Sequence, residues 1–171
     1  MRLRVLLAAN LLALSVAGCA SLEGLRALIQ PPRFEQANDR QSEIRLSTMP
    51  SGRVSPGATV RIWTDVTNPN PFGFTLSTVR ATLWLDDVEA ADADFPLGLP
   101  LQPRQTETIP FDLTVSFANV PRLATAIRQA ASGGGLSYRL EGTIGVDAGR
   151  FGQPTFGPLT VVSGDLRARF Q

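Results

Sequence analysis

Hydrophobic and polar residues alternate at every second position along most of the chain from Phe34 onward. This spacing puts one face of a segment in a core and leaves the other face in solvent, which is typical of β-strands. The clearest run is residues 109–117, and residues 136–146 repeat the pattern. The alternation changes phase between Leu76 and Val79, which predicts a β-bulge. Shorter runs of the same kind occupy residues 44–46, 60–66, 79–85 and 166–170.

Segments rich in glycine, proline and aspartate separate these runs and mark the expected turns. They are residues 49–57, 86–94, 99–105 and 147–154. Several strands at this spacing favour an antiparallel sandwich over a sheet of alternating strands and helices. The pattern therefore predicts an all-β fold.

One short helix is expected within this series of strands. Asn119 is a candidate N-cap, Pro121 falls in the first turn, and Leu123 and Ile127 share one face. The three glycines at 133–135 end the helix, since nothing around them fits a phosphate-binding loop. We expect this helix to cap one end of the sandwich.

The first 18 residues have the pattern of a secretory signal. Arg2 and Arg4 precede an apolar run over residues 5–14, and small residues follow at 17–18. The run is shorter than the stretch of about 20 apolar residues that a membrane-spanning helix needs. We therefore expect residues 1–18 to be a cleaved signal peptide and not a permanent membrane helix.

Cys19 follows this segment directly, and the run from Val16 to Cys19 resembles the signal of bacterial lipoproteins. In such proteins the cysteine is acylated and becomes the first residue of the mature chain. Cys19 is the only cysteine, so an exported protein cannot use it in an internal disulfide. We expect a lipid on Cys19 to bind the protein to a membrane, with residues 19–32 as lipidated N-terminus and tether. By the same resemblance, Ala20 at the next position favours the periplasmic face of the outer membrane in a Gram-negative cell envelope.

The residue types that the sequence lacks exclude most familiar catalytic and metal sites. There is no histidine, no lysine and no cysteine other than Cys19. Ser-His-Asp and Cys-His nucleophiles, Schiff-base chemistry and ordinary zinc sites each need one of these residues. The net charge is +1 and the arginines are scattered, which argues against nucleic-acid binding. We expect no enzymatic activity, no cofactor, no metal and no small-molecule substrate.

The stretch from Asn68 to Phe72 interrupts a strand with two Asn-Pro pairs. Pro69 and Pro71 cannot donate a ladder hydrogen bond, and each favours extended geometry in the residue before it. The side chains of Asn68 and Asn70 can bond nearby main-chain groups in place of the lost partners. Because prolines in sheets lie at edges and bulges, we interpret the stretch as a place where the chain leaves one strand for another, and not as a ligand site.

The order of these segments resembles the WHy (water stress and hypersensitive response) domain of type 2 late-embryogenesis-abundant (LEA) proteins. That family has an NPN motif after its first strong strand, which the run from Asn68 to Pro71 matches. A second strand, a strand that leads to a short helix, and a Y-x-l-x-G strand follow, and the run from Tyr138 to Gly142 matches the last of these. The chain departs from the family at Asp86, where members often have a glycine-containing turn.

The resemblance implies an immunoglobulin-like or fibronectin-III-like antiparallel β-sandwich with one short helix over residues 33–171. It also implies a non-catalytic role in tolerating drying, freezing or related stress. Our main hypothesis is therefore a membrane-anchored envelope lipoprotein that protects proteins or membranes and contacts protein clients weakly. The alternative is an envelope module that docks one specific protein partner through a sheet edge or an exposed aromatic face.

Trp63 and Trp84 are the candidates for such an aromatic face. Both lie opposite the main apolar sets of their strands, so we expect them to be partly exposed. If their strands are neighbours, the two rings pair across the sheet and form a contact patch. The other interpretation, which we favour, is that they simply cover the outer sheet or the tether.

An acidic run gives two further alternatives. It contains Asp86, Asp87, Glu89, Asp92 and Asp94. Carboxylates of this kind can bind calcium or act as a glycosidase pair, but the run lacks the D-x-[DN]-x-[DN]-G loop. We favour a solvated hairpin turn, which also protects the neighbouring sheet edge from aggregation.

Overall fold

The computed structural model describes residues 29–48, 54–116, 123, 125 and 135–170. This part of the chain contains eight strands, most of them long. In chain order they are β1 (Arg33–Gln36), β2 (Glu43–Thr48), β3 (Val54–Thr67), β4 (Phe74–Leu85), β5 (Val88–Leu101), β6 (Thr106–Ser116), β7 (Leu136–Asp147) and β8 (Thr155–Phe170). A 3-10 turn, η1 (Gly149–Phe151), lies between β7 and β8.

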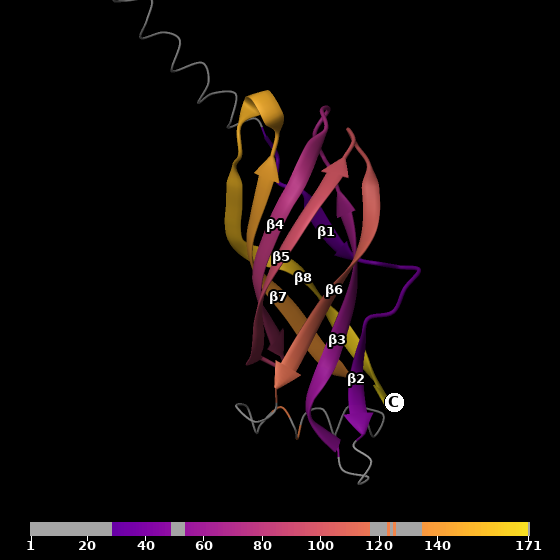
Figure 1. Ribbon diagram of the computed structural model, residues 1–171. Coiled ribbons are helices and arrows are strands. Elements are labelled where there is room, and N and C mark those ends of the chain that lie inside the picture. The colour runs from indigo at the N-terminus through magenta and orange to yellow at the C-terminus, as the bar shows by residue number, and fades with distance from the viewer. Residues whose placement is uncertain (1–28, 49–53, 117–122, 124, 126–134, 171) are drawn as a thin grey trace, which may run out of the picture.

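The strands form two sheets that pack face to face (Figure 1). One sheet has the order β5-β4-β7-β8 and is antiparallel throughout. In the other, β3 pairs with β6 on one side and with β1 and β2 on the other, again antiparallel. Strand β8 belongs to both sheets, because residues 155–166 pair with β7 and residues 167–170 run parallel to β2. The fold is the all-β sandwich that the sequence predicts.

The core lies between the sheets and is formed by the apolar faces that the alternation predicts. The bulge is present as well, since the register of β4 against both β5 and β7 shifts between Leu76 and Thr78. Because of this shift, Leu76 and Val79 both point into the core. The largest fully buried side chains are Phe111, Ile44, Ile62, Leu76, Leu83, Leu85, Leu101, Leu123, Leu136, Leu140 and Ile144.

The two sides of the sandwich are closed in different ways. Along one side, β5 and β6 are the outer strands of their sheets, and the rings of Phe95 and Phe111 meet with centroids 4.8 Å apart. Such an aromatic contact adds about 0.5–1.5 kcal/mol to the area that it buries. Along the other side, main-chain hydrogen bonds close the fold, because β8 crosses from one sheet to the other.

Strand β5 is the main difference from the sequence prediction. The assignment of residues 86–94 to a turn is wrong beyond Asp87, since β5 begins at Val88. The pattern hid this strand because β5 is an outer strand that pairs with β4 alone, where prolines and exposed acidic residues are tolerated. Its prolines are Pro96 and Pro100.

The expected helix lies mostly outside the described residues. Leu123 and Thr125 have helical main-chain conformation, and Leu123 is buried in the core. The signal peptide, Cys19 and Ala20 also lie outside the described residues. Within the part that the structure does describe, no helix has the length and hydropathy to cross a membrane.

Four segments meet at one end of the sandwich, which we call the upper end after its place in Figure 1. They are residues 29–33, 68–73, 102–105 and 148–154. The opposite, lower end carries the β4–β5 turn at residues 86–87. Strands β4 and β7 run between the two ends, so the long axis of the domain follows the strands.

Candidate functional site

Asn68 ties the loop after β3 to the start of the loop after β5. Its side chain is fully buried, and its Nδ2 amide donates to the carbonyl oxygens of Phe72 at 2.8 Å, Gln102 at 3.0 Å and Leu101 at 3.2 Å. Its main-chain N–H donates to the Gln105 carbonyl oxygen at 2.9 Å. The two N–H groups of this amide are thus shared among three carbonyl oxygens, two of them in loops and that of Leu101 at the end of β5. Main-chain carbonyl groups in such places require a donor from elsewhere.

Asn70 continues this network toward the N-terminus. Its Nδ2 amide donates to the Gln30 carbonyl oxygen and its Oδ1 accepts from the Gln30 N–H, both at 2.9 Å. Its own main-chain N–H and its Nδ2 amide also donate to the Asn68 Oδ1, at 2.9 Å and 3.1 Å. Asn70 is 1% exposed, so a buried residue of the Asn-Pro loop holds the incoming chain through partly buried hydrogen bonds.

The chain before β1 is part of the domain from residue 29. Ile29 is 5% exposed and belongs to the hydrophobic core, and Pro32 is buried. The sequence assigns residues 29–32 to the tether. In the structure Ile29 and Pro32 are buried at the upper end, and the exposed Gln30 is held there by Asn70. Neither the burial of Ile29 nor the bond to Gln30 has a signal in the local sequence pattern.

The Asn-Pro loop joins a strand of one sheet to a strand of the other. It leaves β3 after Thr67 and enters β4 at Phe74, whose side chain is buried. Phe72 is half-buried and stacks on Phe151 of η1 with centroids 4.8 Å apart. The Arg150 guanidinium lies 4.9 Å from the centroid of the Phe151 ring, and Pro71 is exposed. The polar side chains of the motif therefore bind the protein's own main chain. The outer surface beside them consists of aromatic rings and a guanidinium group.

The two tryptophans do not form a joint patch. Trp63 lies on β3 and Trp84 on β4, strands of different sheets that do not pair with each other. Both are half-buried, as expected, and each is covered by arginine. The Arg40 guanidinium lies 4.3 Å from the Trp63 ring centroid, and that of Arg139 lies 5.5 Å from the Trp84 ring centroid.

An ion pair lies beside Trp63 on the outer face of β3 and β6. The Arg61 guanidinium binds Asp112 with two hydrogen bonds, Nε to Oδ1 at 2.6 Å and Nη2 to Oδ2 at 2.8 Å. The hydrogen bond from Arg61 holds the pKa of Asp112 below its ordinary value, and the same bond raises the pKa of Arg61. This pair joins two neighbouring strands of the sheet.

At the lower end, Asp86 and Asp87 form the turn of the β4–β5 hairpin. Asp86 and Asp87 both have positive φ angles, 45° and 61°, as a two-residue hairpin turn requires. The Asp86 carboxylate accepts from the Ser137 N–H at 3.0 Å and from its hydroxyl at 2.9 Å, and Asp87 pairs with Arg139 at 3.0 Å. Among the described residues, no group of three or more acidic residues is placed to hold a metal ion.

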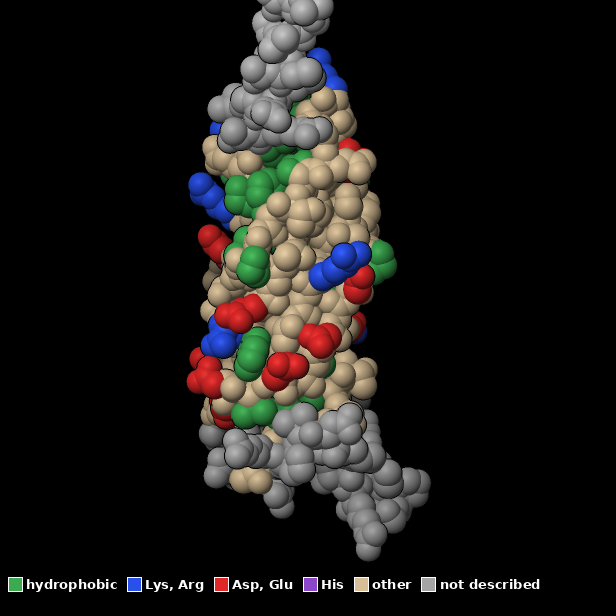
Figure 2. Space-filling view, turned by 90° about the vertical axis from the view of Figure 1, so that its left-hand side faces the viewer, with side chains coloured by type: hydrophobic (Ala, Val, Ile, Leu, Met, Phe, Trp, Pro, Cys, Tyr) green, Lys and Arg blue, Asp and Glu red, His purple; other side chains and the backbone are tan. Residues whose placement is uncertain are grey.

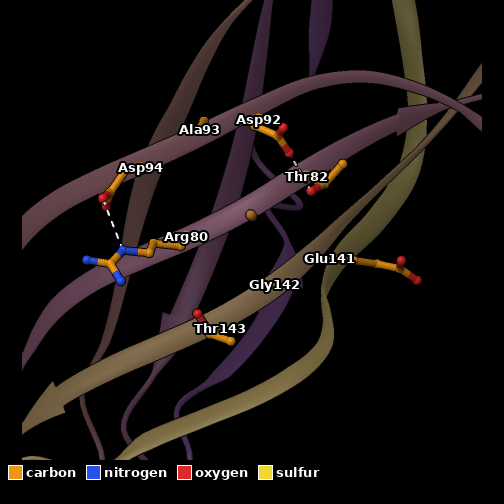
Figure 3. Close-up of a pocket in the computed structure, with 9 residues that line it drawn as sticks. Arg80, Thr82, Asp92, Ala93, Asp94, Glu141, Gly142 and Thr143 are labelled. Atoms are coloured by element: carbon orange, nitrogen blue, oxygen red, sulfur yellow. Dashed lines mark hydrogen bonds and ion pairs between the residues drawn. The ribbon is translucent and has the colours of Figure 1, made fainter.

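The outer face of the β5-β4-β7 sheet has a shallow depression of about 420 Å³ (Figure 3). Its sides are polar, with Arg80 bonded to Asp94 at 3.1 Å and the Thr82 hydroxyl donating to Asp92 at 2.6 Å. Glu141 points away from these pairs and binds Arg139. The polar groups bind one another, so the depression offers a charged surface and not a prepared ligand site.

Comparison with known proteins places this geometry in a family. Residues 64–161 match the family described as late embryogenesis abundant protein (LEA_2). The chain belongs to the LEA_2 family. The matched region starts in β3 and ends in β8, so it includes the Asn-Pro loop of the LEA_2 domain. Among curated proteins, none matches this chain.

One solved structure with a TM-score above 0.5 shows the same fold at low sequence identity, and two others are similar at lower TM-scores. The solution structure of AT1g01470 from Arabidopsis thaliana is 17% identical, with a TM-score of 0.51 over 77% of this chain and 82% of that one. At2g46140.1, described as a candidate LEA protein, is 14% identical with a TM-score of 0.49 over 92% of this chain and 88% of that one. A protein from Archaeoglobus fulgidus is 14% identical with a TM-score of 0.44, over 76% and 97%.

Proposed function

We propose that this LEA_2 protein is a non-catalytic, membrane-anchored lipoprotein of the cell envelope that protects proteins or membranes during desiccation or related stress. The LEA_2 match over residues 64–161 carries the proposal. Cys19, directly after a secretory pattern, supports attachment through a lipid. Two or more acyl chains, at about 0.8 kcal/mol per buried methylene, hold a protein on a membrane stably.

The contact between Asn70 and Gln30 fixes the place on the domain at which such an anchor is attached. Nine residues lie between Cys19 and Ile29, and a fully extended chain over the ten steps from one to the other spans at most about 35 Å. The sandwich therefore stays close to the membrane, held at its upper end. Its polar outer faces, with their ion pairs, remain available for weak contacts that keep partly unfolded clients apart.

A drying experiment tests the protective role. The mature chain, residues 19–171, is dried with a drying-sensitive enzyme, and the recovered activity is measured after rehydration. An equal mass of an unrelated small β-sandwich is the control. We expect clearly higher recovery with the LEA_2 protein, and equal recovery would contradict the proposal. The tested chain includes residues 29–32 because these residues pack on the domain.

A second experiment tests the anchor separately. The substitution Cys19→Ser should abolish both membrane retention and the acyl mass on the N-terminal peptide. Ser21→Ala, two residues away, is the matched control and should change neither. Unchanged retention of the Cys19→Ser protein would contradict lipidation without affecting the family assignment.

Docking of one protein partner through a sheet edge is less well supported by the structure. The outer strands carry prolines at Pro96, Pro100 and Pro110, which interrupt the row of main-chain donors that an added strand needs. Glu89 and Asp92 are exposed on β5, and charged side chains of this kind also discourage strand addition. A stoichiometric complex in a crosslinked membrane extract would favour the docking module over the protectant.

A further inference from the structure

The first segment that the structure describes, residues 29–37, is hydrogen-bonded to the domain through its main chain. We call this segment the strap. The Asn70 side chain binds the N–H and the carbonyl oxygen of Gln30. Strand β1 pairs with β3 over residues 64–67, and the N–H of the last strap residue donates to the Trp63 carbonyl oxygen at 3.0 Å. Among the described residues, no side chain of the strap forms a hydrogen bond or an ion pair with the domain.

Apolar side chains supply the rest of the strap's attachment. Ile29 and Ala37 are each 5% exposed, Pro32 is buried, and Phe34 is half-buried against the core. The side chain of Gln30 is exposed, although its main chain is bound. The site under the strap therefore binds an extended main chain and a few apolar side chains, and it makes no use of polar side chains.

The strap is weakly paired compared with the other strands. Strand β1 is the shortest of the described strands, and β3 is its only ladder partner among them. Directly opposite Gln36, the Thr64 hydroxyl is fully buried and has no hydrogen-bond partner within the described part of the chain. A buried polar group without a partner destabilises the contacts around it, and segments with few hydrogen bonds open most readily. We therefore expect the strap to open before the domain unfolds.

The loop between β1 and β2 allows the strap to leave while the rest of the sandwich stays in place. Residues 38–41 are all exposed, and the loop projects from the side of the sandwich in Figure 1. Ser42 is buried, and its hydroxyl accepts from the Trp63 N–H at 3.1 Å, which fixes the chain just before β2. Departure of the strap would therefore free the edge of β3 at residues 64–67 without separating β2 from β3 or β8.

The edge of β3 under the strap suits another strand better than the outer edges of β5 and β6 do. Residues 64–67 contain no proline, so the main-chain groups that β1 uses remain usable by a replacement. On the face shown in Figure 2, hydrophobic side chains gather near the upper end, where the strap begins. An extended segment with apolar side chains would thus find both a ladder and apolar contacts at this place.

We propose that the strap is displaceable and that its site binds an extended, apolar-rich segment of a partly unfolded protein client. The choice of a client as the partner rests on the proposed protective function. The client segment takes the place of β1 on β3, is held by Asn70 through its main chain, and puts apolar side chains where Ile29 and Phe34 lie. Because the polar contacts are made with main chain, clients of many sequences fit. Because the strap competes for the same place, their binding is weak and reversible.

A disulfide that locks the strap tests whether its site opens. The mature chain, residues 19–171, carries Cys19→Ser, so that no native thiol remains. Glu35→Cys and Asp65→Cys place two cysteines directly opposite each other on β1 and β3. The Cα atoms of such a pair lie about 4.5–5.5 Å apart, which suits a disulfide. The unlocked control carries Glu35→Ser and Asp65→Ser in the same chain.

The probe is a fluorescein-labelled peptide with the sequence of residues 29–37, and fluorescence anisotropy measures its binding. We expect the unlocked protein to bind the peptide about ten-fold more tightly than the locked protein. Ile29→Ala in the unlocked chain weakens its own strap and should tighten peptide binding several-fold. A peptide with Ile29→Ser and Phe34→Ser should lose its binding. A peptide with Gln30→Ala should bind as before, because the Gln30 side chain is exposed.

Three results would overturn the proposal. One is equal binding of the peptide to the locked and unlocked proteins, which would place the contact elsewhere on the domain. Another is an absence of binding even to the unlocked protein with Ile29→Ala. The third is a disulfide-linked dimer as the main oxidised species on a non-reducing gel, which would make a second copy of this chain the occupant of the site.

The drying experiment with the same two proteins distinguishes this proposal from the protective function. If neither protein protects the enzyme better than the unrelated β-sandwich while the unlocked protein still binds the peptide, the protective function fails and the binding site stands. If the unlocked protein protects and the locked protein does not, clients are held at the strap site. Equal protection by both would show that clients are held elsewhere, which would overturn the proposal.

Discussion

Asn70 binds both main-chain polar groups of Gln30, with its Oδ1 and Nδ2 atoms each 2.9 Å from their partners. A side-chain amide that accepts from an N–H and donates to the carbonyl of the same residue reproduces the pattern of a strand pair. The incoming chain is thus attached to the sandwich by an asparagine where a strand would otherwise be needed. The Asn-Pro motif has a structural task that depends on a residue 40 positions away.

We predict that Asn70→Ala frees the N-terminal segment. The substitution removes both bonds to Gln30 and one donor to the Asn68 Oδ1 in a buried setting, at a cost of about 1–3 kcal/mol in unfolding free energy. Urea denaturation measures this loss, and limited proteolysis should show new cleavage within residues 29–33. Asn38→Ala, at an exposed position, is the control. An unchanged cleavage pattern in the Asn70→Ala protein would contradict the role of Asn70 in holding the N-terminal segment.

We predict that Asn68→Asp makes the stability depend on pH. The carboxylate oxygen in place of Nδ2 would face the carbonyl oxygens of Phe72, Leu101 and Gln102, while the other oxygen keeps its donors from Asn70. We expect a loss of about 3–5 kcal/mol at neutral pH, because a buried charge is left against carbonyl oxygens. Burial raises the pKa of this carboxyl in the folded protein above its unfolded value. Stability is then highest in acid and falls as the pH rises through the folded pKa.

Urea denaturation at acid and at neutral pH measures this effect. Asn68→Ala is the matched control, because it removes the same donors without adding a charge. The difference between the two variants should shrink in acid. A constant difference over this pH range would show that the carboxylate is not buried against the carbonyl groups.

We predict a small effect with the opposite pH dependence for Asp112→Asn. The Arg61 guanidinium holds the pKa of Asp112 below its ordinary value. The ion pair therefore stabilises the fold above the unfolded pKa of Asp112, and this contribution is lost as the pH falls through the folded pKa. The Asp112 side chain is 45% exposed, so the loss at neutral pH should be at most about 1 kcal/mol.

Thermal denaturation of both proteins across the acid range measures this prediction. The wild-type and Asp112→Asn proteins should converge in strong acid, where Asp112 is protonated in both states. Asp39→Asn is the control, since Asp39 lies 3.8 Å from Arg40 and is 70% exposed. A difference in melting temperature between the two proteins that persists in strong acid would assign the effect to packing and not to the ion pair.

We predict that Gly142→Ala destabilises the sheet. A Cβ atom at this position would lie 1.9 Å from the Arg80 carbonyl oxygen on β4, and a main-chain atom cannot move aside cheaply. The expected cost is about 3 kcal/mol of unfolding free energy, the upper range for overpacking. Gly135→Ala, where a Cβ meets nothing within 4 Å, is the control and should be close to neutral. Equal stabilities of the two variants would contradict the close approach.

The sequence predicts structural features that depend only on residues close together in the chain. The alternation over residues 136–146 identifies the buried face of β7, and the change of phase after Leu76 locates the bulge. Both depend only on neighbours in the chain, because a strand presents every second side chain to the same face. The asparagines of the Asn-Pro loop do bond main-chain groups, as their chemistry favours.

The sequence does not predict contacts that depend on which segments meet. Nothing near Gln30 indicates that Asn70 binds it, and the alternation cannot show that Trp63 and Trp84 lie on different sheets. Strand β5 escapes for another reason. Its first half alternates alanine with acidic residues, and its second half places proline or glycine between the inward apolar residues. These residue types have low preference for strands, and pairing with β4 outweighs that preference.

The passage of β8 from one sheet to the other has a consequence for the order in which the fold is completed. Residues 167–170 pair with β2, among the first strands of the domain, while the preceding residues pair with β7. The side of the sandwich that β8 closes therefore stays open until the last strand is available, and contacts between such distant segments form slowly. A chain that lacks β8 cannot close this side, so the sandwich is completed only when its last strand pairs with one of its first.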